Sequence, residues 1–104
     1  GFAAFSGKVA LSVSAGLRES TILFYDGSGV DSTFSNNGVD IPLIILDSNR
    51  LIKKLDAPHM SEDLEYRNGI LAVAFEAGAK KYGMGLVPSS ERSIRGMEIE
   101  KLLP

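Results

Sequence analysis

One segment near the C-terminal end of the chain holds the side chains best suited to ligand chemistry. Ser89 or Ser90 can cap the start of a helix, where free backbone N–H groups attract an anion. Arg92 and Arg95 lie three residues apart, so both can reach a single phosphate or carboxylate. We therefore predict a ligand-binding site for a small anion at Ser89, Ser90, Arg92 and Arg95. The alternative is an ordinary solvated helix start in which Glu91 pairs locally.

Motifs for catalysis or metal binding are missing from the sequence. His59 is the only histidine, and neither a second histidine nor a His-Glu pair accompanies it to build a zinc site. The absence of cysteine excludes disulfides, thiolate nucleophiles and thiolate metal sites. The serines lack a Gly-x-Ser-x-Gly elbow, and one histidine leaves little room for a catalytic triad. We therefore predict no catalytic residue, no metal and no cofactor, and favour a protein that is not an enzyme.

The composition limits the classes of protein to which this chain can belong. The chain has 104 residues, of which 44% are hydrophobic and 23% charged, as in a single globular domain. Its net charge of −2 argues against a nucleic-acid partner. No apolar stretch approaches the roughly 20 residues of a membrane span, and the first residues lack the basic region of a signal peptide. We expect a cytoplasmic protein without a membrane partner, and interpret residues 1–104 as one domain cut or processed from a longer chain.

The first third of the chain predicts an antiparallel meander of strands. Residues 8–14 alternate between apolar and small or polar side chains, which is the period of a half-buried strand. Residues 20–25 are rich in β-forming side chains, and an Asp-Gly turn separates them from a third short strand at 30–34. The apolar run 41–46 contains a proline at its start, which places it at a strand start or a sheet edge.

The middle of the chain predicts two helices. Asp47 and Ser48 are suitable N-caps, and the apolar residues at 51, 52 and 55 follow at helical spacing, ending before Pro58. A second helix is predicted over residues 68–81, because lysines and then a glycine mark its end. The pair Asn68-Gly69 leaves a second interpretation open, in which it forms a hairpin turn between residues 64–67 and 70–75.

A last helix is predicted after residues 88–91, with more apolar side chains than one narrow core face needs. Part of this stripe can pack on a protein partner or a second copy, and the alternative is that it belongs to the core. The interface residues that we predict are Ile94, Met97, Ile99 and Leu102.

The order of these elements predicts the fold class. Strands gathered first and helices gathered later indicate an α+β domain. We expect a mainly antiparallel sheet with two to three helices packed on one face.

Residues 5–34 carry a pattern of their own. It comprises Phe5-Ser6-Gly7-Lys8-Val9, the alternating Leu11 and Val13, the run Ile22-Leu23-Phe24-Tyr25-Asp26-Gly27, and then Val30 and Ser32. This third of the chain resembles the hairpin of the PATAN-type effector domains. The helix that the family carries ahead of the glycine has no counterpart in this sequence. Residues 36–60 of this sequence have no counterpart in the family. The resemblance implies a non-enzymatic regulatory module that works through protein contacts, and it supplies no catalytic residues.

Three functional hypotheses follow from the sequence. The first is a non-catalytic regulatory or protein-interaction module that associates with itself or with a protein partner. The second is a small anion- or phosphate-binding domain, or an enzyme, that uses the helix start at residues 89–95. The third is a purely structural domain of a larger assembly, which the sequence does not separate from the first.

Overall fold

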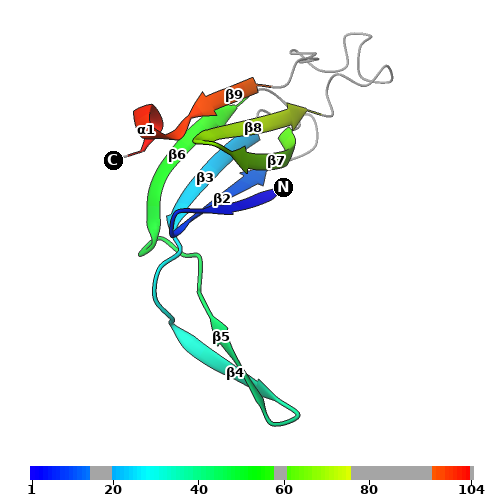
Figure 1. Cartoon of the computed structure of the whole chain (residues 1–104), viewed down its shortest axis with the longest axis vertical. Coiled ribbons are helices and arrows are strands. Elements are labelled where there is room, and N and C mark those ends of the chain that lie inside the picture. The colour runs from blue at the N-terminus through cyan, green and yellow to red at the C-terminus, as the bar shows by residue number, and fades with distance from the viewer. Residues whose placement is uncertain (15–19, 58–60, 76–94, 104) are drawn as a thin grey trace.

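The computed structural model describes residues 1–14, 20–57, 61–75 and 95–103, and these ranges form nine strands and one short helix (Figure 1). All strand pairs are antiparallel, and they make three separate sheets of four, two and three strands. The elements are β1 (Phe2–Phe5), β2 (Lys8–Val13), β3 (Ser20–Asp26), β4 (Ser32–Asn36), β5 (Val39–Leu43), β6 (Leu51–Ala57), β7 (Ser61–Arg67), β8 (Ile70–Phe75), β9 (Arg95–Glu98) and α1 (Ile99–Leu102).

The four-stranded sheet, sheet A, has the strand order β1-β2-β3-β6. Ser6 and Gly7 close the first hairpin with φ values of 46° and 71°, which is the left-handed conformation that a two-residue hairpin turn requires. Alternate residues of these strands point to opposite faces, so Ala3, Ala10 and Phe24 lie side by side on the buried face.

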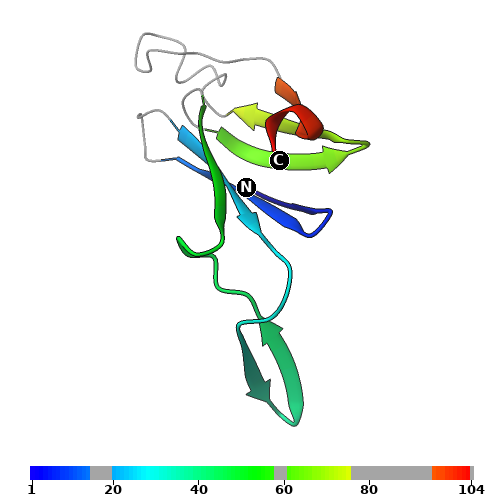
Figure 2. The same cartoon turned by 90° about the vertical axis from the view of Figure 1, so that its left-hand side faces the viewer.

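The three-stranded sheet, sheet C, has the order β7-β8-β9 and covers the buried face of sheet A (Figure 2). Leu71 and Val73 of β8 point into the core, where they are 0% and 1% exposed. The ring of Phe5 on β1 stacks on that of Tyr66 on β7, with centroids 4.5 Å apart, and so joins the two sheets. The core is therefore a thin sandwich between two antiparallel sheets.

The two-stranded sheet, made of β4 and β5, projects away from this sandwich (Figures 1 and 2). We call residues 32–43 the arm, and the rest of the described chain the body. Every residue of β4 and β5 is exposed to solvent. The arm lies along the longest axis of the molecule, whose extents are 52 × 33 × 23 Å.

The predicted α+β class is wrong, because the described residues form mostly antiparallel strands with a single one-turn helix. The strands predicted at 8–14 and 20–25 are confirmed as β2 and β3. The third strand forms, as β4, but it does not extend the meander: β6 pairs with β3, and β4 pairs with β5. The described residues contain no helix that is long enough and apolar enough to span a membrane.

The first predicted helix is wrong because its residues complete a sheet. Leu51–Ala57 forms β6, which pairs with the free edge of β3 with a register shift at Phe24/Tyr25. Leu55 lies opposite Ile22 and packs against the core from a strand. Helical spacing over so few residues is compatible with either structure, and the unpaired edge of β3 decides between them.

The helix predicted over residues 68–81 is wrong over its described part, and the open alternative is the one that the structure adopts. Asn68 and Gly69 have φ values of 52° and 82°, which a helix excludes and a hairpin turn needs. Residues 61–67 and 70–75 are the paired strands β7 and β8.

Over its described part the last predicted helix is a single turn, α1, preceded by the strand β9. Met97 lies opposite Leu71 in the sheet, so the free edge of β8 holds this segment extended. Residues 88–91, the predicted start of this helix, lie outside the described residues.

Candidate interaction surface: the projecting arm

The arm has one apolar face that no described part of the body covers. In its register Phe34 lies opposite Ile41, while Leu43 and Val39 occupy the alternate positions that share this face. Their exposed fractions are 51% for Phe34, 44% for Ile41, 40% for Leu43 and 59% for Val39. Four large apolar side chains thus stand together in solvent.

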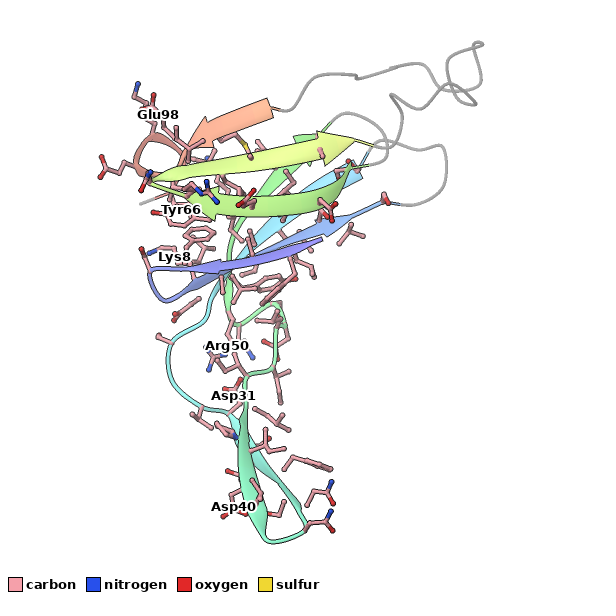
Figure 3. All side chains as sticks on the ribbon, turned by 45° about the vertical axis from the view of Figure 1, so that its right-hand side comes forward. Lys8, Asp31, Asp40, Arg50, Tyr66 and Glu98 are labelled. Atoms are coloured by element: carbon pink, nitrogen blue, oxygen red, sulfur yellow. The ribbon has the colours of Figure 1, made fainter. Side chains whose placement is uncertain are left out.

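The opposite face of the arm is mostly polar. Thr33 lies opposite Pro42, and Ser35 lies opposite Asp40. The Ser35 hydroxyl donates a hydrogen bond to Asp40 Oδ1, which ties the two strands together near the tip of the arm (Figure 3). The arm is therefore an amphipathic hairpin whose alternation has the period of a half-buried strand, with neither face buried.

Asn37 and Gly38 close the arm. Their φ values are 51° and 76°, which is the conformation that an Asn-Gly hairpin turn adopts. Local sequence therefore specifies the hairpin, and packing on the body is not needed to define its turn.

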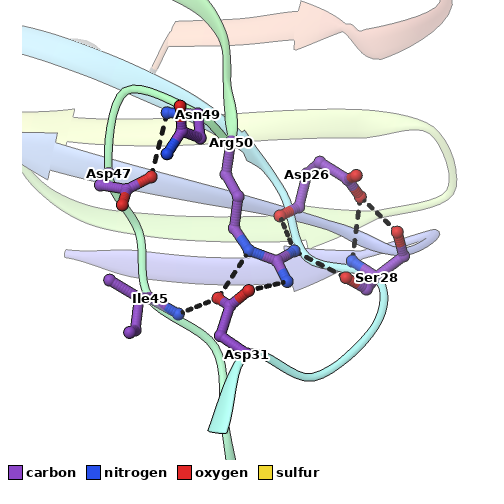
Figure 4. Close-up of polar contacts among 7 residues, drawn as sticks. All are labelled: Asp26, Ser28, Asp31, Ile45, Asp47, Asn49 and Arg50. Atoms are coloured by element: carbon purple, nitrogen blue, oxygen red, sulfur yellow. Dashed lines mark hydrogen bonds and ion pairs between the residues drawn. The ribbon is translucent and has the colours of Figure 1, made fainter.

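Arg50 fixes the base of the arm to the body (Figure 4). Its Nε donates to Asp31 Oδ2 at 2.9 Å, and its Nη2 donates to Asp31 Oδ1 at 3.0 Å. Its Nη1 donates to the carbonyl oxygens of Asp26 at 2.9 Å and Ser28 at 2.6 Å. The side chain is only 13% exposed. Four charge-assisted hydrogen bonds from one planar group define the direction in which the chain leaves β3.

Asp31 links the two segments that lead into and out of the arm. Besides Arg50, its Oδ2 accepts a hydrogen bond from the backbone N–H of Ile45 at 2.6 Å, and its own N–H donates to the carbonyl of Leu43. The hydrogen bonds from Arg50, with help from the Ile45 N–H, hold the pKa of the Asp31 carboxyl below its usual range. The same contacts raise the pKa of Arg50. The pair is therefore charged throughout the physiological range.

Asp26 organises the turn on the other side of Arg50. Its Oδ1 accepts hydrogen bonds from the hydroxyl of Ser28 at 2.6 Å and from the Ser28 N–H at 2.9 Å. These bonds lower the pKa of the Asp26 carboxyl. This local turn explains the shifted carboxyl without a ligand. We call Asp26, Ser28, Asp31, Ile45 and Arg50 the clamp.

The predicted anion site lies almost wholly outside the described residues. Ser89, Ser90 and Arg92 lie outside the described residues, and Arg95 is placed only as the first residue of β9. The described ranges contain no group of three or more histidine, cysteine or acidic side chains able to hold a metal ion. His59 lies outside the described residues.

The predicted interface residues separate into two groups. Met97, Ile99 and Leu102 are half-buried and pack against the core cluster of the sandwich. Ile94 lies outside the described residues. The role of these residues in an interface stays a prediction, and their packing shows that three of them contribute to the fold.

The strands predicted at 30–34 and 41–46 overlap β4 and β5, but their pairing into an arm was not predicted, and neither was the clamp. The Asn-Gly pair at 37–38, flanked by an apolar alternation, is the signal that marks the arm as a hairpin. No local pattern marks Arg50, because its partner Asp31 is 19 residues away.

Comparisons with known proteins give no family for this chain. The sequence matches no protein-family model, and it matches none of the curated proteins and none of the solved structures.

Proposed function

We propose that this domain is a non-catalytic protein-interaction module and that the apolar face of its arm is the contact surface. The observation that carries the proposal is the set of four exposed apolar side chains on one face of a projecting hairpin. Single exposed apolar residues are normal on a protein surface, whereas a contiguous apolar group is typical of an interaction site.

The physical chemistry of an isolated hairpin supports the same proposal. Two strands without a third layer are marginally stable in water, so an arm of this kind gains order by packing its apolar face on something else. The clamp holds the base of the arm in one direction before any partner arrives. An element held in its bound direction loses less conformational entropy on binding, which raises affinity.

The resemblance of residues 5–34 to the PATAN-type hairpin is consistent with this proposal, since it also implies a module that works through protein contacts. The resemblance covers β2, β3 and the start of β4, and the rest of the arm lies outside it.

The proposal is tested by photo-cross-linking. A photoreactive phenylalanine analogue in place of Phe34 puts the reactive group on the apolar face of the arm. The same analogue in place of Asp63, an exposed residue of β7 on the body, is the control. We expect irradiation to give a discrete product of higher mass from position 34 and none from position 63.

The cross-linking is done with the purified protein and with extract of the cells that make it. Equal products from positions 34 and 63, or no product from position 34 in either preparation, would contradict the proposal.

A further inference from the structure

Sheet A has a second apolar surface, on the side away from sheet C. The residues next to the buried ones in each strand point outward, so Phe2, Leu11 and Leu23 form one row across β1, β2 and β3. The next row ends in Tyr25 and Leu51. We call the following residues the outer face of sheet A: Phe2, Ala4, Val9, Leu11, Val13, Leu23, Tyr25 and Leu51.

This outer face is unusual for a surface of the sandwich. Phe2, Val13 and Leu51 are at least 40% exposed, whereas Tyr25 is buried, with 8% exposed. None of the eight residues belongs to the core cluster between the sheets or to the side chains packed against it. The corresponding side of sheet C carries charged residues, among them Glu65 and Arg67, which form an ion pair at 3.2 Å. The outer side of sheet C therefore carries charge, whereas the outer face of sheet A is mainly apolar.

We propose that the arm of one copy packs its apolar face on the outer face of sheet A of a second copy. This inference rests on the proposed function, because it uses the same arm surface, and it adds the identity of the partner.

The arm and the outer face cannot satisfy each other within one chain. The arm leaves the body at the clamp and extends away from both sheets (Figures 1 and 2). The bidentate pairing of Arg50 with Asp31 opposes the reversal that would fold the arm back onto its own sheet. Two apolar surfaces that belong to one chain but point apart are brought together by a second copy.

The two surfaces also match in size and charge. Five-residue strands at about 3.4 Å per residue give an arm about 17 Å long, and the five residues of the outer face from Val9 to Val13 span about the same length. The apolar face of the arm carries no charge, and the charged side chains beside the outer face, Lys54 and Asp56, stand on edge strand β6. An apolar centre with charge at its rim is the arrangement typical of a protein interface.

Complementation between two variants tests the pairing. The arm variant is Phe34→Thr with Ile41→Thr, and the face variant is Phe2→Thr with Leu51→Thr; threonine keeps the strand propensity at all four positions. The control is Ile70→Thr, which removes another exposed apolar residue of the body, outside both surfaces. Light scattering across a concentration range measures the mass of each protein, which is 11.1 kDa for one chain.

We expect the wild type and the control to associate, and each variant alone to associate about tenfold more weakly or worse. A mixture of the two variants is expected to form a one-to-one pair, because one chain still supplies an arm and the other still supplies an outer face. This recovery on mixing also shows that both variants are folded.

Other outcomes overturn the inference in ways that separate it from the proposed function. If the face variant associates like the wild type while the arm variant does not, the arm contacts another arm. The proposed pairing then fails, and the proposed function of the arm as a contact surface stands. If the wild type stays at the mass of one chain at all concentrations, the partner is a different protein. If the arm variant associates like the wild type, both the inference and the arm's role in self-association fail.

A second measurement is independent of variant stability. Copies with the photoreactive analogue at position 34 are mixed with copies labelled with ¹⁵N, irradiated and digested, and the joined peptides are identified by mass. We expect peptides of β1, β2 or β3 from the labelled copy. Attachment to β4 or β5 of the labelled copy would overturn the proposed pairing in favour of contact between arms.

Discussion

The β4–β5 arm and the β7–β8 hairpin follow the same local rules of turn formation, but they differ in whether their apolar side chains are buried. Both turn on an Asn-Gly pair, with φ values of 51° and 76° in the arm and of 52° and 82° in the β7–β8 hairpin. In each hairpin one strand alternates apolar and polar side chains, β5 in the arm and β7 in the other, while β8 is apolar throughout. The β7–β8 hairpin buries Leu71 and Val73 in the core, whereas the arm exposes all of its apolar side chains.

This difference separates what local sequence decides from what packing decides. Turn residues and alternation are sufficient to specify a hairpin and its register. Burial of the apolar face contributes most of the stability, and of the two hairpins only β7–β8 has it within the described residues. In the arm the clamp fixes the direction, and no described residue buries the apolar face.

The largest expected effect comes from removing one apolar side chain from each hairpin. Leu71→Ala, in the core, should lower the free energy of unfolding by about 2–5 kcal/mol, because it leaves a cavity in a fully buried site. Ile41→Ala, on the arm, should change it by less than about 0.5 kcal/mol, since its side chain touches water in the single chain. Urea unfolding at a concentration where the protein is monomeric measures both values. A loss of the same size at Ile41 would mean that the arm packs on its own body.

A smaller effect is expected from the turn glycines. Gly69→Ala should destabilise the domain by about 1–2 kcal/mol, because a residue with a side chain is strained in the left-handed conformation. An added Cβ meets open space at both Gly69 and Gly38, so the strain is conformational and not a clash. Gly38→Ala carries the same strain but should leave the unfolding of the body unchanged, and should loosen only the arm.

Urea unfolding reports the body in this pair of variants, and the backbone amide spectrum of residues 32–43 reports the arm. Equal destabilisation of the body by Gly38→Ala and Gly69→Ala would show that the arm and the sandwich unfold as one unit.

The sequence predicts local strands well and their partners poorly. Alternation identified β2, and a high content of β-forming side chains identified β3. Periodicity failed for β6 and for β8, whose apolar residues also fit a helix over one or two turns. For β6 the free edge of β3 decides the structure, and a window of neighbouring residues does not contain that information. For β8 the Asn68-Gly69 turn and the adjacent strand β7 decide it.

The candidate site was predictable in one part only. The Asn37-Gly38 turn and the apolar alternation around it are visible in the sequence, and they are sufficient to predict a hairpin there. That this hairpin would lie apart from both sheets could not be predicted, because it depends on β6 taking the edge of β3. The clamp joins Arg50 to residues 19 to 24 positions earlier, and such pairing leaves no local pattern.

The smallest expected effect concerns the pH dependence of the arm's direction. The pKa of Asp31 is lowered in the folded protein, chiefly by the hydrogen bonds from Arg50, relative to about 3.9 for an ordinary aspartate. A lowered pKa means that the folded state favours the charged carboxylate. The clamp therefore contributes fully above about pH 4, and its contribution is lost as the pH falls through the folded pKa of Asp31.

The backbone N–H of Ile45, which donates to Asp31, reports this titration directly. We expect its amide chemical shift to be constant from about pH 5 to pH 8 and to change with a midpoint below about 3.9. Arg50→Gln removes the guanidinium and should move that midpoint upward, towards the ordinary value. The amide of Leu71, in the β7–β8 hairpin, serves as the internal control, because its neighbours opposite are Tyr66 and Met97 and no carboxylate. A midpoint at Ile45 that is at or above the ordinary value in the wild type, or is unmoved by Arg50→Gln, would mean that the arm is held by its strands and turn alone.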